Sequence, residues 1–271
     1  MERLPLYFDK NENRYLIQKS TSYCFVFDLN EVKDKAKIVM FTGFNADLLL
    51  LNLNKDIELE IEVQSESSLR VAILGENPLN SLKITANVGE MSHLSYYFAD
   101  FIPGKVNANV TVNLNGQNAS ANCHLASLSR DNDNKEFDVS VFHNSINTYS
   151  HMDNYGVCRD NGKLVFSGIC KIEKGKHGSK THQNAKIMVF DEASNGIAKP
   201  ILKIDENDIE ASHAAIVGKI NDEHIFYLTS RGLTEEEAKR LITFGYLKPI
   251  MNGFVDQELK DYIEQKIEGK M

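Results

Sequence analysis

The chain has 271 residues, of which 42% are hydrophobic, and a formal net charge of −8. It is long enough for one large domain or two ordinary ones. The acidic balance argues against a nucleic-acid-binding protein, because phosphate contacts need clustered Lys and Arg. No run approaches the ~18 apolar residues of a membrane span, and the N-terminal residues lack a basic start followed by an apolar run. We therefore expect a cytoplasmic protein whose partners include neither membrane nor nucleic acid.

Residues 36–230 carry the pattern of a β body. Apolar and polar residues alternate there, most clearly in the heptapeptide IELEIEV at residues 57–63, as in half-buried strands. Similar runs occur at residues 69–73, 82–84, 106–114, 119–125, 137–141 and 164–172. Residues 29–35 and 192–196 have only weak helical patterns. The sequence therefore predicts a mainly β fold.

The residues alone leave the β architecture open. Sandwiches, barrels and β-helices all fit a succession of short strands, and no strict short repeat identifies a regular β-helix. Asn115-Gly116 stands between two alternating runs. This dipeptide would suit a tight hairpin, which counts slightly against an all-parallel sheet.

Residues 231–271 have a helical pattern. Thr234 and Glu237 form a capping box at the start of a first helix, which Pro249 ends. Ala238, Leu241, Ile242 and Gly245 are expected on one face of that helix. Asp256 is expected to cap a last helix with an apolar stripe of Leu259, Ile263 and Ile267. The final residues, EQKIEGKM, are expected to be frayed.

The four cysteines do not indicate a metal site. Cys24, Cys123, Cys158 and Cys170 form no CxxC pair or other close ligand spacing. A disulfide framework is not expected in a reducing compartment. We interpret all four as small core residues.

Two polar groupings resemble active sites but have simpler explanations. His143, Thr148 and Ser150 look like a nucleophile-and-base set, yet no orienting acid or nucleophile elbow accompanies them. A polar ladder inside a β-helix would explain them without catalysis. The basic stretch from Lys171 to His182 lacks the spacing of a phosphate-binding loop. We interpret it as a solvated turn, with its two histidines, His177 included, at the surface.

Two blocks of sequence together resemble a known family. Residues 205–247 give an acidic segment, His213 in a turn of small residues, an apolar strand at 225–228, Ser-Arg-Gly at 230–232 and the capped helix. Upstream come His143 with a Thr-x-Ser, the strand pair around 156–168, Asn184 before three aliphatic residues, and the segment PILKI at 200–204. Their order and spacing between about residues 137 and 250 resemble the SufB/SufD family, the scaffold proteins of the SUF iron–sulfur cluster assembly system.

The resemblance implies a fold and a division of the chain. The expected fold is a right-handed parallel β-helix with a small C-terminal helical module. Residues 1–35 would form a lead-in that is reduced relative to the family, residues 36–230 the β-helix core, and residues 231–271 a helical module for ATPase docking. The implied function is a non-catalytic scaffold whose partners are a SufC-type ABC ATPase and a SufB-type subunit, or a second copy of this chain.

Departures from the family motifs favour a short SufD-like protein. Ser194 stands where the SufB branch has a cysteine, six residues before Pro200. Ala211 stands where SufD-type members often have Cys, and Ala214 where they have Gly. The usual N-terminal helical region is reduced or absent.

The resemblance also implies site residues. His213 would be a ligand for iron or for a transient cluster at the heterodimer interface, since a neutral imidazole can ligate iron. No tightly bound cofactor is expected. Arg231 and Gly232 would contribute to partner binding. The apolar side chains Phe244, Tyr246 and Leu247 would be its anchors, because aromatic residues are favoured in interface cores.

Two other functions compete with this interpretation. A stand-alone β-helix binding module for a polymer such as carbohydrate would need a solvent-facing aromatic stripe. The only dense aromatic group is Tyr96, Tyr97, Phe98 and Phe101. An enzyme of pectate-lyase type would need clustered Asp with Lys or Arg on one face, and Asp131 and Asp133 in a turn do not meet that requirement.

Overall fold

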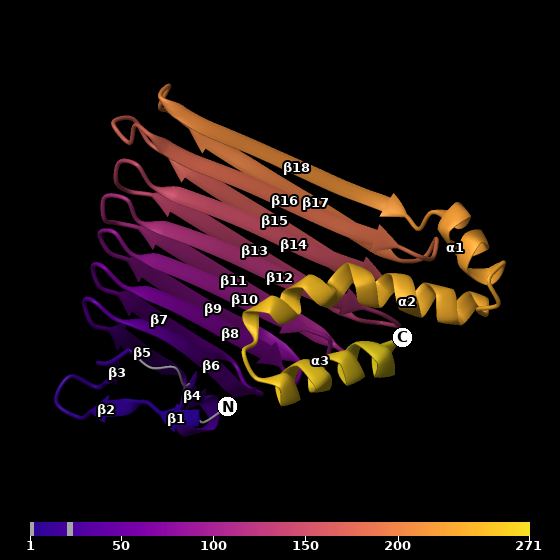
Figure 1. Cartoon of the computed structure of the whole chain (residues 1–271), viewed down its shortest axis with the longest axis horizontal. Helices are drawn as coiled ribbons and strands as arrows, with labels where there is room; N and C mark the ends of the chain where they lie inside the picture. Colours follow the sequence, from indigo (N-terminus) through magenta and orange to yellow (C-terminus); the bar gives the residue numbers. More distant parts are fainter. Residues whose placement is uncertain (1–2, 21–23) are drawn as a thin grey trace.

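The structure, a computed structural model, describes residues 3–20 and 24–271. Two nine-stranded sheets, here called sheet A and sheet B, lie face to face and are followed by a helical module (Figure 1). In spatial order, sheet A contains β1 (Arg3–Pro5), β4 (Cys24–Asp28), β6 (Asn45–Leu53), β8 (Ser68–Gly75), β10 (His93–Asp100), β12 (Ser120–Ser129), β14 (Tyr149–Cys158), β16 (Ser179–Val189) and β18 (Ile209–Lys219). Sheet B contains β17 (Asn195–Ile204), β15 (Lys163–Ile172), β13 (Asn134–His143), β11 (Lys105–Leu114), β9 (Leu79–Val88), β7 (Ile57–Val63), β5 (Lys35–Met40), β3 (Arg14–Ile17) and β2 (Tyr7–Asp9).

The chain winds as a parallel β-helix. From β4 onward, consecutive strands alternate between the two sheets, so each turn adds one strand to each. Among the described strands, every pair is parallel except β2 with β3. The predicted β-helix with C-terminal helices is therefore confirmed. Strands occupy much of the expected lead-in, beginning at Arg3.

The turns of the β-helix lengthen along the chain, which explains why no fixed repeat is visible in the sequence. Leu48 pairs with Val71, 23 residues later, whereas Met152 pairs with Gln183, 31 residues later. The strands lengthen too, from five residues in β4 to eleven in β16. Figure 1 shows the resulting wedge, which is broader toward β18.

The core lies between the two sheets. Alternate residues of each strand point inward, as in β7, where Ile57, Leu59, Ile61 and Val63 are all buried. Because the strands pair in parallel, equivalent residues of successive turns lie one above another. The inward residues therefore form continuous columns. The predicted alternation therefore identifies the core correctly.

Asn115-Gly116 forms a corner between the sheets, so the hairpin interpretation was wrong. It joins β11 of sheet B to β12 of sheet A. A Cβ on Gly116 would lie 2.0 Å from the Glu90 amide nitrogen in the turn below. Glycine is needed here because successive turns approach closely, and the left-handed residue of this corner is Asn118, with φ 58°.

The helical module begins earlier than the sequence suggested. It comprises α1 (Asp222–Thr229), α2 (Glu235–Leu247), the 3₁₀ segment η2 (Lys248–Gly253) and α3 (Gln257–Lys270). The strand expected at residues 225–228 is part of α1, because the Asn221 side chain caps the first turn by accepting from the Glu223 amide at 2.8 Å. The weak helical patterns correspond to a short 3₁₀ turn at Leu29–Glu31 and to a turn leading into β17.

The predicted caps of α2 and α3 are confirmed, but the apolar face of α2 differs. The Thr234–Glu237 capping box is complete, and Asp256 accepts from the Glu258 amide at 2.9 Å. Of the expected α2 face, Ala238 is buried whereas Leu241 is 52% exposed. The buried positions continue through Thr243 and Leu247.

The module folds back over the outer face of sheet A (Figure 1). A second apolar core joins side chains from the ends of the sheet A strands to the module. Its module members include Leu247, Ile250, Phe254, Ile263 and Ile267. Sheet A is therefore covered on both faces along this part, whereas no helix of the described residues lies on the outer face of sheet B.

Candidate functional site

The two ends of the β-helix differ. At the N-terminal end, β2 folds back on β3, and the Tyr15 ring packs at a tilt against Phe8 and Phe27, with centroids 4.8 and 4.4 Å away. At the other end, β17 and β18 are the edges of their sheets, and no described element covers them. Ile201, Ile216 and Val217 are 41%, 56% and 45% exposed there. An uncovered strand edge beside exposed aliphatic side chains is a surface on which another chain can pair.

His213 lies in the middle of β18, so the expected turn around it was wrong. It pairs with Gln183 of β16, whose side chain is buried and only 3% exposed. Because paired residues of parallel strands point the same way, His213 continues an inward-facing column. No described strand lies above β18, and the imidazole is exposed at the open end.

The backbone of β18 also offers free hydrogen-bonding groups. The Ile220 amide donates to the Val189 carbonyl at 3.1 Å. In a parallel strand every second residue bonds to the same neighbour. The amides of His213 and Ala215 therefore point away from β16, toward the open edge.

Directly below the open end lies a buried polar ladder. His143 Nδ1 is 2.8 Å from Thr148 Oγ1, and its Nε2 is 2.9 Å from Ser150 Oγ. Hydroxyls of Ser179 and Thr181 on the next turn continue the ladder at 2.8 Å each. Burial lowers the pKa of His143 to about 4. The expected internal ladder is present, and its full burial leaves it no access to a substrate.

All four cysteines are buried, as expected. Burial raises the pKa of Cys123 and of Cys158 to about 12. A thiol with such a pKa is protonated near neutral pH and is a poor metal ligand or nucleophile. Ser194 lies in the turn before β17, and its hydroxyl donates to the Asp191 carbonyl at 2.7 Å. Thus the described residues present no exposed thiol at the open end.

The predicted partner-binding residues of α2 are engaged within the chain. Leu247 is fully buried in the core between the module and sheet A. Phe244 and Tyr246 are half-buried against the same core, and the Tyr246 ring meets Tyr155 of β14 edge to face at 5.5 Å. Their role as anchors stays a prediction, and it would require α2 to shift from the sheet.

The surface of the module is formed by other side chains. Phe226 and Tyr227 of α1 are 75% and 53% exposed. The Arg231 guanidinium stacks over the Tyr227 ring at 4.5 Å. Gly232 has φ +99°, a conformation that favours glycine and turns the chain from α1 into α2. This aromatic surface was not anticipated, because residues 225–228 were interpreted as a strand.

The C-terminal residues are anchored, so the expected fraying was wrong. Lys270 Nζ lies 2.6 Å from Asp133 Oδ2 and donates to the Leu128 carbonyl at 2.6 Å. Arg159 donates to the Met271 carbonyl at 3.0 Å and pairs with Glu236 at 3.0 Å. Burial lowers the pKa of Lys270 to about 8. These contacts tie α3 and α2 to the ends of the sheet A strands.

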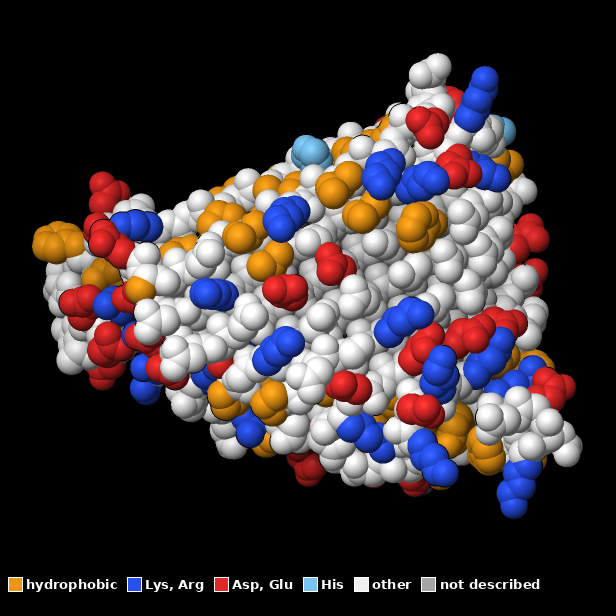
Figure 2. Space-filling view, turned by 180° about the vertical axis from the view of Figure 1, so that it is seen from behind, with side chains coloured by type: hydrophobic (Ala, Val, Ile, Leu, Met, Phe, Trp, Pro, Cys, Tyr) orange, Lys and Arg blue, Asp and Glu red, His pale blue; other side chains and the backbone are white. Residues whose placement is uncertain are grey.

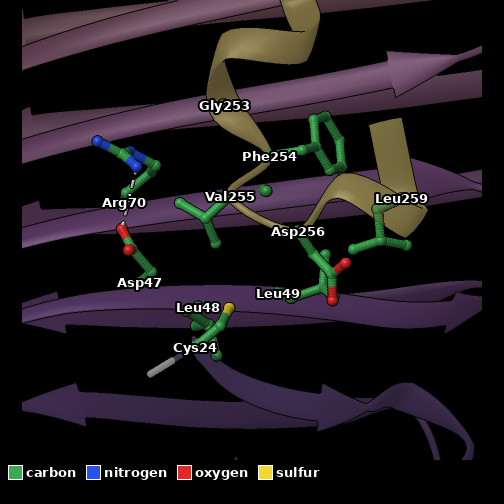
Figure 3. A pocket seen from close by; sticks show the side chains of 11 residues that line it. Cys24, Asp47, Leu48, Leu49, Arg70, Gly253, Phe254, Val255, Asp256 and Leu259 are labelled. Carbon is green, nitrogen blue, oxygen red and sulfur yellow. Dashed lines mark ion pairs between the residues drawn. The ribbon is translucent and has the colours of Figure 1, made fainter. Parts of the chain in front are cut away.

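A small pocket marks the seam between the module and sheet A (Figure 3). Leu49 and Cys24 approach it from the strands, and Phe254 and Leu259 from the module. The Asp47–Arg70 pair borders it, with Oδ1 and Nη1 3.4 Å apart. Its lining is mainly apolar, and we interpret the pocket as a packing seam.

A histidine cluster on the outer face of sheet A was not anticipated. His151 Nε2 lies 2.8 Å from Asp153 Oδ2, and His124 Nδ1 lies 3.8 Å from the same oxygen. The hydrogen bond to Asp153 raises the pKa of His151, whereas burial lowers that of His124. His151 and Asp153 lie two residues apart on β14, and the strand register brings His124 of β12 beside Asp153. Within residues 3–20 and 24–271, no group of three or more His, Cys, Asp or Glu side chains is arranged to hold a metal ion.

The aromatic group that a polymer-binding module would need is largely buried. Tyr96, Phe98 and Phe101 are at most 3% exposed, and only Tyr97 of this group reaches the surface. In the described part of the chain, no helix is long and apolar enough to cross a membrane.

Comparison with known proteins agrees with the fold. A family model described as the SufBD core domain of the SUF system for FeS cluster assembly matches residues 28–246. The iron–sulfur cluster assembly protein SufD of Bacillus subtilis (strain 168) is 33% identical over 161 residues, which are 59% of this chain and 37% of that protein. SufD of Escherichia coli (strain K12) is 26% identical over 200 residues, 71% of this chain and 46% of that protein.

A SufB protein is also similar. SufB of Bacillus subtilis is 25% identical over 155 residues, 55% of this chain and 33% of that protein. The chain thus spans less than half the length of these curated relatives. Because the core-domain match covers most of the chain, this protein belongs to the SufB/SufD family of the SUF iron–sulfur cluster assembly system.

Proposed function

We propose that this chain is a SufD-like, non-catalytic scaffold subunit of a cytoplasmic SUF complex. Its partners would be a SufB-type subunit, or a second copy of this chain, and a SufC-type ATPase. The observation that carries the proposal is the open end of the β-helix, where two strand edges and His213 are exposed together. The similarity to SufD and SufB proteins supports the same role.

Pairing would occur edge to edge at β17 and β18. Each edge presents free amides and carbonyls, which a partner strand can satisfy. The exposed aliphatic side chains Ile201, Ile216 and Val217 would lose contact with water in the same step. A partner with a similar open end would continue both sheets at once.

Iron or a nascent cluster is the cargo of such a complex, and His213 is the candidate ligand. A neutral imidazole can ligate iron, and this one stands where a partner would meet the chain. The described thiols of this chain are buried, so the partner would supply the thiolate ligands. Binding would be transient because one imidazole alone holds a metal weakly.

The ATPase would dock on the helical module. Phe226 and Tyr227 give α1 an exposed aromatic surface, and aromatic residues are favoured as binding anchors. Arg231 and Gly232 shape that surface through the stacking contact and the left-handed turn. Phe244, Tyr246 and Leu247 lie at the far end of α2, in or against the core with sheet A, and would transmit a shift of α2 to that sheet.

Co-expression with a SufB-type protein and a SufC-type ATPase tests the proposal, with complex size measured by chromatography with light scattering. We expect one stable complex of the three proteins. Ala215→Pro should abolish pairing with the SufB-type protein while leaving the chain folded, because this amide points to the open edge and not into the ladder. Phe226→Asp should release the ATPase, and Tyr262→Asp, on the exposed side of α3, is its control.

His213→Ala separates assembly from cluster binding. We expect the variant to form the complete complex but to bind less iron and sulfide after reconstitution. Full cluster loading by this variant would refute the role of His213 as a ligand but would leave the scaffold proposal intact. If the wild-type chain elutes by itself in the presence of both partners, the scaffold proposal fails.

A further inference from the structure

The outer face of sheet B changes its charge pattern along the β-helix. In the first turns, lysines face carboxylates on the neighbouring strand: Lys37 Nζ lies 2.9 Å from Glu60, and Lys83 Nζ lies 3.0 Å from Glu58. On the last two strands this pairing between neighbouring strands stops, and Lys171 of β15 pairs only with Glu173 of the turn that follows. No described carboxylate lies within ion-pairing distance of Lys163, Lys199 or Lys203.

Aliphatic side chains occupy the positions between these lysines. Val165 of β15 pairs with Ile197 of β17, and Ile169 pairs with Ile201. All four point outward, because the alternate residues of β15, from Leu164 to Cys170, are buried in the core. Ile201 is 41% exposed and the other three are half-buried. Solvent-facing positions of a sheet are normally polar, so two adjacent aliphatic pairs are unusual.

The geometry makes these residues one surface. Paired residues lie about 4.8 Å apart, and alternate residues of one strand about 6.7 Å apart. The two aliphatic pairs are therefore roughly 13 Å apart along the strands, with Lys199 between them and Lys203 beyond the second pair. Figure 2 shows hydrophobic side chains and lysines over the broad end of this face, with acidic side chains beside them. We call Val165, Ile169, Ile197, Ile201, Lys199 and Lys203 the lysine–isoleucine face.

We propose that the lysine–isoleucine face docks an acidic segment of a partner protein, in which aliphatic residues alternate with Asp or Glu. The aliphatic pairs would be buried by the partner's aliphatic residues. Its carboxylates would pair with the lysines, as Glu58 and Glu60 do for the lysines of the first turns. This docking differs from edge pairing because it uses side chains on the sheet surface and no backbone groups, and Ile201 is the one residue that the two surfaces share.

The net charge of the chain favours a short protein segment over a larger polyanion as the partner of this face. With a net charge of −8, the molecule as a whole repels an anionic membrane or a nucleic acid. Three unpaired lysines on one face cannot offset that long-range repulsion. A short acidic segment meets only the local field of the face, because charges beyond about 8 Å are screened at physiological salt.

The test uses a blocked, labelled ten-residue peptide that alternates Glu and Ile, with binding to the isolated chain measured by fluorescence anisotropy. We expect saturable binding that weakens with salt, and much weaker binding of a Glu–Ser peptide of equal charge. Lys199→Gln with Lys203→Gln should weaken binding about tenfold, as should Ile197→Thr with Ile201→Thr.

The matched control is Lys35→Gln with Lys83→Gln, which removes the same charge from the same sheet face. It should bind the peptide as the wild type does, and thermal unfolding should show that all variants are folded. An equal loss in the control, or no saturable binding by the wild type, overturns the proposal. Binding of phosphatidylglycerol vesicles with the same dependence on Lys199 and Lys203 would identify the face as a lipid site and also overturn it.

Discussion

His143 gives the sharpest stability prediction. Its imidazole is 1% exposed and is held between the hydroxyls of Thr148 and Ser150. Burial disfavours the charged form and lowers the pKa to about 4, from an ordinary value of 6.5. The folded protein therefore keeps this imidazole neutral in mildly acidic solution, whereas the unfolded chain protonates it.

The sign and magnitude follow from proton linkage. Below pH 6.5 the unfolded state binds a proton that the folded state does not bind, so stability falls as pH falls from 6.5 toward 4. One pKa unit corresponds to about 1.4 kcal/mol. Between pH 7.5 and pH 4.5 the shift at His143 therefore removes about 2.5 kcal/mol of stability.

Urea unfolding of the wild type and of His143→Gln, at both pH values, isolates this contribution. Glutamine does not titrate, so the variant should lose about 2.5 kcal/mol less than the wild type over this interval, although it is less stable at neutral pH. His177→Gln is the matched control, because this histidine is exposed in a turn. If wild type and His143→Gln lost the same free energy, His143 would not be a neutral buried group, and its assignment to an internal ladder would be wrong.

Two substitutions and one labelling experiment test the packing of the β-helix and its module. Ile263→Ala removes a fully buried side chain of the module core and should cost about 2–5 kcal/mol in urea unfolding. Gly116→Ala places a methyl group 2.0 Å from the Glu90 amide nitrogen; we expect a lower unfolding midpoint and poor expression, and an unchanged midpoint would show that the turns are not so close. Ellman's reagent should leave Cys123 and Cys158 unmodified in the folded protein and react with them in urea, and rapid reaction without denaturant would contradict their burial.

The strands were predictable from sequence, but their arrangement was not. The heptapeptide at Ile57–Val63 alternates because one face of each strand lies in the core, and this signal is local. The parallel partner of a strand lies 21 to 32 residues away, at a distance that changes along the chain. No fixed repeat therefore appears, and the β-helix could be chosen only from the resemblance of the later blocks to a family.

The errors around His213 and α1 have local causes. His213 stands among small residues that are typical of turns, yet β16 supplies a template that extends the segment as β18. The Ile225–Leu228 run is apolar over four residues, a length that fits a strand or part of a helix. Asn221, followed by Asp222 and Glu223, is a helix start signal, and it distinguishes the helix from the strand.

The candidate site was predictable only in part, because some of its contacts join residues that are far apart in the sequence. The ladder of His143, Thr148 and Ser150 is close in sequence, so its internal character could be predicted. The pairing of His124 with Asp153, and of Ile169 with Ile201, depends on register between strands about thirty residues apart. The burial of Leu247 depends on how the module folds back on sheet A, which no local pattern indicates.

The connection between β18 and α1 suggests how the two proposed partners could influence each other. Only Ile220 and Asn221 separate the strand from the helix, and both are fixed, the first by its hydrogen bond to Val189 and the second as the helix cap. A displacement of α1 would therefore act directly on the strand that carries His213. Sheet A resists such a displacement through β16, because Met188 of that strand and Phe190, the residue after it, pack against the module core. A docked ATPase that moved α1 would thus shift the exposed strand β18 more easily than the covered strands. The scaffold proposal requires a movement at this open end, because the partner subunit would pair there.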